Sequence, residues 1–182
     1  MFQAFYPGEY IDSTYHIDFQ ELYRKGYRGI IFDIDNTLVP HGALADEQSI
    51  ALFQQLRQLG FHTILLSNNK EPRVQPFAHA VKSRYIVKAG KPAVRNYRRA
   101  MKLMKTNYET TLFIGDQLFT DIWGANRTGI MSILVQPIHQ KEEIQIVLKR
   151  YLERIVLHFY KKECRKKQSY SGKDGNNGNK QD

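Results

Sequence analysis

Two aspartates separated by one residue follow a short apolar run in the stretch Gly29–Pro40, which reads GIIFDIDNTLVP. Side chains alternate along an extended chain, so Asp33 and Asp35 can both face one pocket. In such a pair, one carboxylate can attack phosphorus, while its neighbour gives a proton to the leaving oxygen and later takes one from water. A lone pair more often solvates a turn or caps a helix, so the chemistry needs further residues.

Polar residues also follow three later apolar runs. Ser67 and Asn68 follow the second run, Lys91 follows the third, and Asp116 follows the fourth, with Asp121 five positions further on. Carboxylates gathered at one edge of a sheet would repel one another, and a bound cation would remove that repulsion. Oxygen ligands without cysteine or clustered histidine favour Mg²⁺, which also helps to hold a phosphate. The pattern therefore predicts a magnesium site that handles phosphate.

The remaining polar groups suit a phosphorylated substrate. Ser67 and Asn68 can donate hydrogen bonds to phosphoryl oxygens, and Lys91 adds a positive charge that steadies the acidic cluster. Together with the paired aspartates, these groups supply every part required for in-line phosphoryl transfer.

Five short apolar runs predict the strands that position these groups. Most are continuous rather than alternating, as expected where helices cover both faces of a sheet. The predicted strands are Gly29–Phe32, Phe61–Leu66, Tyr85–Val87, Thr111–Ile114 and Ile130–Val135. Strands that alternate with helical patterns indicate βαβ units and a parallel sheet in three layers. The predicted fold class is therefore α/β, with ligands beyond the carboxyl ends of the strands.

Helix signals lie between and before these strands. Asp46 is a good N-cap for a helix that Gly60 ends, and Pro72 and Pro92 sit where prolines open helices. The segment Asp18–Gly26 predicts a short helix that leads into the first strand. The rest of the opening segment has no predicted role.

Four motifs, in order, resemble the signature of the haloacid dehalogenase (HAD) superfamily of phosphatases. They are Asp33-Ile34-Asp35-Asn36-Thr37, Ser67-Asn68, Lys91-Pro92, and Gly115-Asp116 with Asp121. The resemblance covers about Gly29–Val135 and implies a three-layer, Rossmann-like HAD fold with a mainly parallel sheet. The phrases FDIDNTL, LLSNN, GKP and GDQLFTDIWGANRTG are similar to the YqeG-type branch of the capless subfamily IIIA. That branch is related to the mitochondrial phosphatases that act on phosphatidylglycerophosphate.

The resemblance also implies a role for each motif residue. Asp33 would be the nucleophile, and Asp35 would be the general acid and base. Asp33, the main-chain carbonyl of Asp35, and Asp116 would bind Mg²⁺. Asp121 would support the water shell of the metal. The expected substrate-binding set is Ser67, Asn68 and Lys91, and Lys91 also belongs to the expected catalytic set.

The intervals between the motifs leave no room for a cap domain over the site. Leu38–Leu66 spans 29 residues and Lys70–Gly90 spans 21, and their own predicted loops, helices and strands fill them. An open site suits a phosphate on something large, such as a lipid headgroup, a nucleic acid end or a protein, because a bulky partner can exclude water. A small substrate is the alternative if a second subunit covers the site. The sequence predicts no oligomeric state.

The basic character of the chain lies at its C-terminus. Residues 149–182 hold 10 of the 27 Lys and Arg residues and 4 of the 18 Asp and Glu residues, so they carry +6 of the net charge of +9. We expect a phosphatase domain at residues 1–160 and a basic, disordered tail at 161–182. Apolar residues at helical spacing in Glu142–Tyr160 predict a helix. That helix either packs on the body or lies on an anionic membrane, and nucleic acid contact is a weaker alternative.

The predicted location is cytoplasmic, with a peripheral position at the inner face of the membrane as the alternative. Cys164 is the only cysteine, which suits a reducing compartment. No apolar run reaches the length of a membrane span, and the first residues lack a signal-peptide pattern.

Three functions stay open on the sequence alone. The leading hypothesis is a Mg²⁺-dependent phosphomonoester hydrolase that forms an aspartyl-phosphate and acts on phosphatidylglycerophosphate. The second keeps the enzyme but changes the substrate to a nucleotide, a sugar phosphate or a nucleic acid end. The third is a non-enzymatic adaptor bound to RNA or a ribosome. An adaptor would not need Asp33, Asp35, Lys91, Asp116 and Asp121 together, so their presence argues against it.

Overall fold

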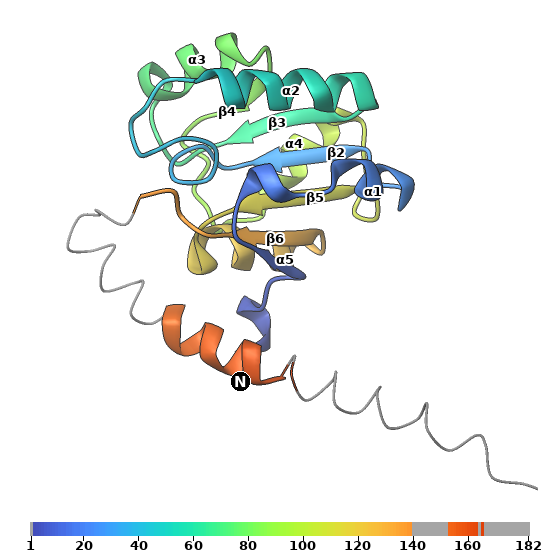
Figure 1. Cartoon of the computed structure of the whole chain (residues 1–182), viewed down its shortest axis with the longest axis vertical. Coiled ribbons are helices and arrows are strands. Elements are labelled where there is room, and N and C mark those ends of the chain that lie inside the picture. The colour runs from blue at the N-terminus through green and yellow to red at the C-terminus, as the bar shows by residue number, and fades with distance from the viewer. Residues whose placement is uncertain (1, 140–152, 164, 166–182) are drawn as a thin grey trace, which may run out of the picture.

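The structure is a computed structural model that describes residues 2–139, 153–163 and 165. A six-stranded sheet in the order β1-β6-β5-β2-β3-β4 forms its centre (Figure 1), and all five strand pairs are parallel. The strands are β1 (Glu9–Ile11), β2 (Gly29–Phe32), β3 (His62–Leu66), β4 (Arg84–Ile86), β5 (Thr111–Gly115) and β6 (Met131–Val135). The predicted α/β fold with a mainly parallel sheet is therefore confirmed.

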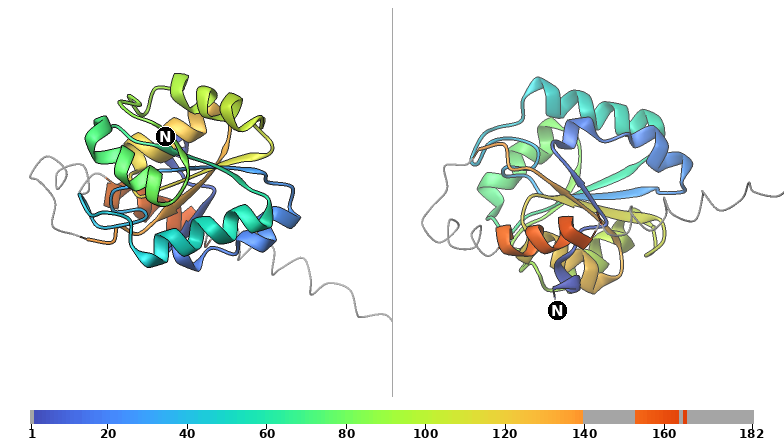
Figure 2. Two further views of the ribbon diagram at one scale, coloured as in Figure 1. Left: turned by 90° about the horizontal axis from the view of Figure 1, so that it is seen from above. Right: turned by 60° about the horizontal axis from the view of Figure 1, so that its bottom comes forward.

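Helices cover both faces of the sheet (Figure 2). They are α1 (Phe19–Arg24), α2 (Glu47–Leu59), α3 (Glu71–Ala80), α4 (Arg95–Met104) and α5 (Trp123–Thr128), with short turns η1 (Gln3–Phe5), η2 (Thr14–His16) and η3 (Leu118–Ile122). Ile30 and Phe32 pack with α1, α2 and α3, whereas Ile31 packs with α4 and α5. This alternation explains why β2 is apolar at every position, because both of its faces are covered.

The five predicted strands are present, with ends shifted by one residue at most. The sixth strand, β1, was not predicted. It has only three residues and pairs only with β6 at the edge of the sheet. A run this short, directly after Pro7 and Gly8, is too brief for an alternating or continuous apolar pattern to emerge.

Most predicted helix boundaries agree with the structure. Asp46 caps α2 through a reciprocal hydrogen bond with Ser49, and Gly60 ends that helix in the left-handed conformation. Pro72 lies in the first turn of α3. The prediction that Pro92 opens a helix was wrong, because α4 begins only at Arg95 and Pro92 lies in the turn before it.

The intervals after β2 and β3 hold no inserted domain. A loop and α2 connect β2 to β3, and α3 connects β3 to β4. Because all six strands are parallel, their carboxyl ends share one edge of the sheet, and we call this the catalytic edge. No cap element from these intervals covers it, as the sequence predicts.

Residues 153–163 form a helix that packs on the body of the domain. Val156 is buried, and the backbone N–H of Leu118 donates a 3.0 Å hydrogen bond to Oε1 of Glu153. The ring of Phe159 stacks on Phe2. The described part of this helix therefore follows the packing alternative, and it continues past the expected domain boundary at residue 160. The predictions for residues 140–152 and 166–182, including most of the tail, lie outside the described residues.

Candidate active site

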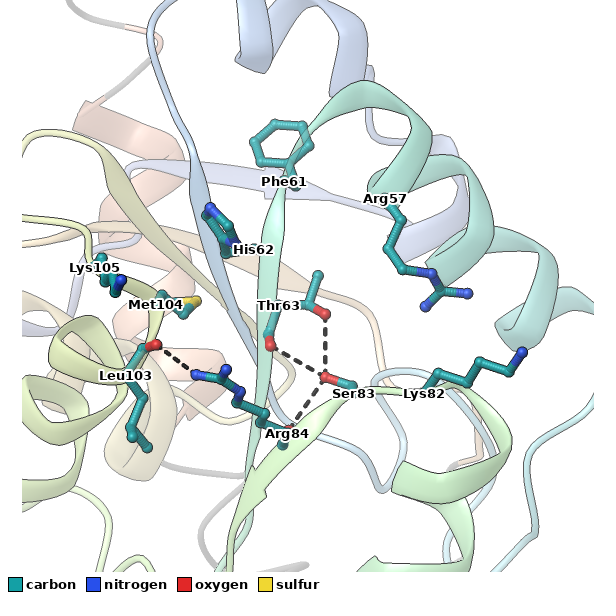
Figure 3. Close-up of a pocket in the computed structure, with 10 residues that line it drawn as sticks. All are labelled: Arg57, Phe61, His62, Thr63, Lys82, Ser83, Arg84, Leu103, Met104 and Lys105. Carbon is teal, nitrogen blue, oxygen red and sulfur yellow. Dashed lines mark hydrogen bonds between the residues drawn. The ribbon is translucent and has the colours of Figure 1, made fainter.

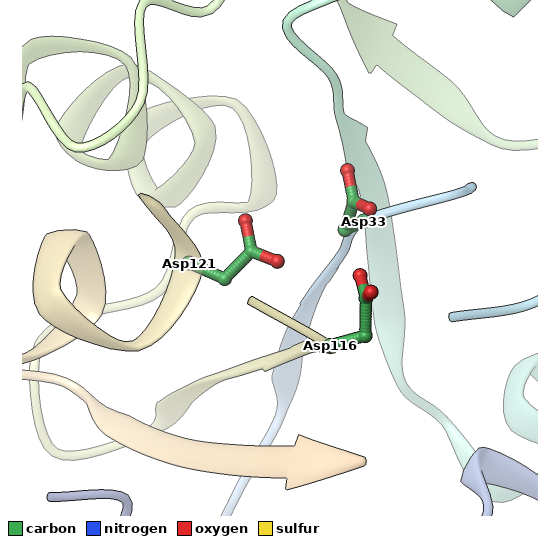
Figure 4. Close-up of side chains that lie close together, drawn as sticks. All are labelled: Asp33, Asp116 and Asp121. Carbon is green, nitrogen blue, oxygen red and sulfur yellow. The ribbon is translucent and has the colours of Figure 1, made fainter. Parts of the chain in front are cut away.

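Three buried carboxylates meet at the catalytic edge (Figure 4). Asp33 follows β2, Asp116 follows β5, and Asp121 lies in η3. One carboxylate oxygen from each residue lies within 4.8 Å of the others. Their exposed fractions are only 6%, 2% and 0%. The structure therefore brings together three of the four residues that were expected to bind metal.

Lys91 is the cation of this cluster. Its Nζ lies 2.6 Å from Oδ1 of Asp33 and 2.7 Å from Oδ1 of Asp121. Burial lowers the pKa of Lys91, but the charges of Asp121 and Asp33 outweigh burial and raise it above its usual value, so the ammonium stays protonated. One ammonium against three ionised carboxylates leaves two negative charges, which a divalent cation would balance.

The pKa of Asp33 is higher than that of an ordinary carboxyl group. Burial raises its pKa to about 6, the charge of Lys91 opposes that shift, and the charge of Asp121 adds to it. A divalent cation bound beside Asp33 would favour the ionised form of its carboxyl group. The donor set, three carboxylates without sulfur or imidazole, is the one that hard divalent cations prefer.

Close backbone packing fixes the position of Asp121. A Cβ on Gly115 would lie 2.5 Å from Oδ2 of Asp121, so only glycine leaves room for this carboxylate. The backbone N–H of Gln117 donates to the same Oδ2 at 3.1 Å. The hydroxyl of Tyr97 donates to the carbonyls of Thr120 and Asp121, which ties η3 to α4.

Thr37 and Asn68 support the other members of the cluster. The hydroxyl of Thr37 donates to Oδ1 of Asp116 at 3.2 Å. The side chain of Asn68 accepts from the backbone N–H of Lys91 at 2.8 Å and donates to its carbonyl at 3.4 Å. In this structure Asn68 therefore shapes the turn that presents Lys91. Its expected hydrogen bond to a phosphoryl oxygen stays a prediction.

Ser67 is buried just after β3, the strand that pairs with β2. Its hydroxyl accepts a 3.2 Å hydrogen bond from the backbone N–H of Asn69, which leaves the hydroxyl proton available for a phosphoryl oxygen. Its position at the end of β3 is the one that the sequence predicts.

The side chain of Asp35 lies in a separate set of contacts. Nε and Nη2 of Arg73 donate to its Oδ1 at 3.2 and 2.7 Å, and the backbone N–H of Gly42 donates to the same oxygen at 2.8 Å. Nδ2 of Asn69 donates to Oδ2 at 2.6 Å. Both carboxylate oxygens are thus held by donors. The resemblance involved only the main-chain carbonyl of Asp35 in metal binding, and this side-chain position leaves that prediction untouched.

Arg73 and Asn69 have no role in the sequence analysis. Arg73 lies in the first turn of α3, where a polar residue ordinarily faces solvent, yet its side chain is only 19% exposed. An arginine one turn into the helix that follows the second motif is the signal that could have indicated it.

Comparison with known proteins places this site in a family. A family model described as haloacid dehalogenase-like hydrolase matches residues 41–129. The probable phosphatase YqeG of Bacillus subtilis (strain 168) is 34% identical over 160 residues, which cover 87% of this chain and 93% of that protein. The chain belongs to the haloacid dehalogenase-like hydrolases. The predicted superfamily, YqeG-type branch and HAD-type phosphatase class are thereby confirmed.

Two further matches are less similar to this hydrolase. It is 26% identical over 170 residues to the chloroplastic and mitochondrial phosphatidylglycerophosphate phosphatase 1 of Arabidopsis thaliana. That alignment covers 88% of the hydrolase and 48% of the plant protein, so the chain spans about half the length of this relative. An uncharacterised protein from Listeria monocytogenes serotype 4b shares the fold, with a TM-score of 0.51, 17% identity, and coverage of 64% of this chain and 84% of that one.

The acidic cluster predicts an effect of Mg²⁺ on thermal stability, which can be measured without an activity assay. Mg²⁺ should raise the melting temperature of the hydrolase, because it balances buried carboxylates in the folded state, and at 100 times its Kd the gain is about 2.7 kcal/mol. Asp116→Asn should lose most of this gain and should melt higher than the original protein without Mg²⁺, because one repelling charge is gone. Thermal denaturation with and without Mg²⁺ measures both effects.

The matched control is Glu109→Gln, because Glu109 is exposed in the loop between α4 and β5, at the opposite edge of the sheet. This variant should keep the full Mg²⁺-dependent rise. If both variants keep the rise, or neither does, the cation does not bind at the cluster.

Proposed function

We propose that this hydrolase is a Mg²⁺-dependent phosphomonoesterase in which Asp33 forms an aspartyl-phosphate. The observation that carries the proposal is the cluster of Asp33, Asp116, Asp121 and Lys91, which joins a buried carboxylate to a cation site and a fixed ammonium. Bound Mg²⁺, held by Asp33, Asp116 and the main-chain carbonyl of Asp35, with Asp121 supporting its waters, would neutralise charge on the transferring phosphoryl group.

The two aspartates divide the bond changes between them. A carboxylate oxygen of Asp33 forms a bond to phosphorus as the bond to the leaving oxygen breaks, and Asp35 gives that oxygen its proton. In the second half, Asp35 takes a proton from water, the water oxygen bonds to phosphorus, and the bond from Asp33 to phosphorus breaks. Inorganic phosphate results, Asp33 is again a carboxylate, and Asp35 is again protonated, as it was at the start. Ser67 and Lys91 hold the phosphoryl oxygens during both steps.

Arg73 is the residue that we add to this mechanism. It binds Asp35 through two nitrogens and so sets the direction of the carboxylate that must meet the leaving oxygen. Arg73 is therefore a positioning residue, because it acts through Asp35 rather than on phosphorus.

For the substrate we propose phosphatidylglycerophosphate. Two kinds of observation support it: the relative from Arabidopsis thaliana is named for that lipid, and the catalytic edge has no cap element after β2 or β3. Apolar residues also border this edge. Leu44, 70% exposed, lies two residues after the Gly42 N–H that binds Asp35, and Ile138, 40% exposed, bonds through its N–H to the carbonyl of Asn36. Such side chains suit contact with lipid.

A lipid substrate would place the enzyme at a membrane surface as a peripheral protein, through this edge and the basic C-terminal segment. No helix in the described part of the chain is long and apolar enough to cross a bilayer. The second candidate substrate is a nucleotide, a sugar phosphate or a nucleic acid end. The cluster by itself would bind only the phosphoryl group, which all these compounds share.

The first test compares two substrates and one substitution. Asp33→Asn should lower phosphate release by about 10³-fold or more, because the nucleophile and one metal ligand are lost together. Phosphate release is measured with Mg²⁺ on short-chain phosphatidylglycerophosphate and on p-nitrophenyl phosphate. Equal rates for Asp33→Asn and the original protein would overturn the nucleophile. Rapid turnover of other phosphates without turnover of the lipid would overturn only the lipid substrate.

The role of Arg73 has a distinctive kinetic signature. Arg73→Gln should lower kcat by about 10²-fold on an alkyl phosphate, whose leaving oxygen needs a proton, and much less on p-nitrophenyl phosphate, whose leaving group departs unprotonated. The Mg²⁺-dependent rise in melting temperature should stay, because Arg73 does not contact the cluster. The exposed Arg98→Gln serves as the control. Equal losses on both substrates would show that Arg73 does not act through proton transfer.

The exposed apolar side chains beside the catalytic edge, Leu44 and Ile138, give a third prediction. Leu44→Ser should weaken binding to phosphatidylglycerol-containing vesicles by about tenfold, because an inserted leucine contributes about 1.5–3 kcal/mol. Hydrolysis of p-nitrophenyl phosphate should not change. Vesicle sedimentation measures the binding. The control is Tyr108→Ser, since Tyr108 is 49% exposed in the loop between α4 and β5, at the opposite edge of the sheet. Equal binding by both variants would contradict membrane contact through the catalytic edge.

A further inference from the structure

A hollow lies at the edge of the sheet opposite the catalytic edge. It has a volume of about 360 Å³ and lies where β3 and β4 begin and where α3 and α4 end (Figure 3). Ten residues line it: Arg57, Phe61, His62, Thr63, Lys82, Ser83, Arg84, Leu103, Met104 and Lys105. The strands separate this hollow from the acidic cluster, because Asp33 and Asp116 follow the carboxyl ends of the same sheet.

The charges around the hollow are all of one sign. Arg57, Lys82, Arg84 and Lys105 line it together with His62, and no carboxylate is among the lining residues. Within the described ranges, none of these five residues forms an ion pair. Like charges in one concave surface repel one another and concentrate a positive potential there. An anion in the hollow would relieve this repulsion.

The two arginines have structural partners. Nη1 of Arg57 donates to the carbonyl of Val81 at 2.7 Å, and Nη1 of Arg84 donates to the carbonyl of Leu103 at 2.8 Å. These bonds satisfy carbonyls at helix ends and hold both guanidinium groups in place. Each guanidinium keeps further N–H donors, because only one of its nitrogens makes these bonds.

The two lysines of the hollow, Lys82 and Lys105, have no structural partners of this kind among the described residues. Lys82 follows Val81, the C-cap of α3, and Lys105 is the C-cap of α4. Their φ values are 53° and 57°, a left-handed conformation in which glycine or asparagine is the ordinary residue. Their ammonium groups make no hydrogen bond or ion pair with the part of the chain that the structure describes. Figure 3 shows Lys82 on the side of Arg57, and Lys105 on the side of Leu103, to which Arg84 reaches. The hollow thus has a cationic pair on each of two sides.

We propose that this hollow binds a small soluble compound with two phosphate charges or more, such as a diphosphate. Two cationic pairs suit two anionic groups. The hydroxyls of Ser83 and Thr63 bond to each other and to backbone carbonyls, so they shape the wall between the pairs and the cations supply the donors. The volume lies at the small end of the range for small-molecule sites, roughly 300–1,000 Å³. Phe61, Leu103 and Met104 supply apolar surface for the rest of a ligand. This site is distinct from the catalytic one and does not depend on the identity of the enzyme's substrate.

Inorganic pyrophosphate is the probe for the test. It is titrated into the whole protein in EDTA at low ionic strength, by calorimetry and by two-dimensional amide NMR. EDTA keeps the acidic cluster free of cations, so that edge repels the probe. We expect one binding event, with amide shifts that centre on residues 62–63, 82–84 and 103–105.

The variant Lys82→Gln/Lys105→Gln removes both free charges and keeps polar side chains that are one atom shorter than lysine. It should bind pyrophosphate at least about tenfold more weakly, because charge-assisted hydrogen bonds are lost on both sides. Arg98→Gln/Arg99→Gln is the matched control, because it removes two charges from exposed positions of α4. Shifts at the catalytic edge alone, no binding at low ionic strength, or equal weakening in the control would each overturn the proposal. The NMR map on the original protein decides the matter even if the double variant folds poorly.

Discussion

Repulsion between three buried carboxylates is the constraint on which the rest of the site depends. Asp33, Asp116 and Asp121 lie close together and away from water, where like charges interact strongly. The ammonium of Lys91 offsets part of this repulsion, and a divalent cation would offset the remainder. The same imbalance that makes the cation-free cluster costly favours a divalent cation at this position.

The fold meets this constraint by bringing distant segments to one edge of a parallel sheet. Gly115 admits the carboxylate of Asp121 at a distance that no larger residue allows, and Asn68 braces the turn of Lys91. The site therefore depends as much on backbone approach as on acidic side chains. The proposed general acid differs, since Asp35 is held by side chains, Arg73 from α3 and Asn69 from the segment after β3, together with the N–H of Gly42.

Much of this arrangement could be predicted from the sequence, because it depends on strand ends. Asp33, Lys91 and Asp116 each lie just after an apolar run, and a parallel sheet brings such positions together. Arg73 could not be found this way, because its contact with Asp35 depends on how α3 docks on the sheet. The strand β1 was missed because three residues cannot display a pattern, and Pro92 was misplaced because hydrogen bonds from Asn68 hold its segment in a turn. Tertiary contacts decided two of these differences, those at Arg73 and Pro92, and strand length decided the third.

The hydrogen bond between Leu118 and Glu153 joins the C-terminal helix to the turn that carries Asp121. Packing of that helix on the domain and cation binding at the acidic cluster therefore involve the same short piece of backbone. If packing of the helix changes cation affinity through this turn, thermodynamic reciprocity requires cation binding to change the packing of the helix by the same factor. A partner that draws the helix away from the domain would break this hydrogen bond and leave the N–H of Leu118, three residues before Asp121, without its carboxylate partner.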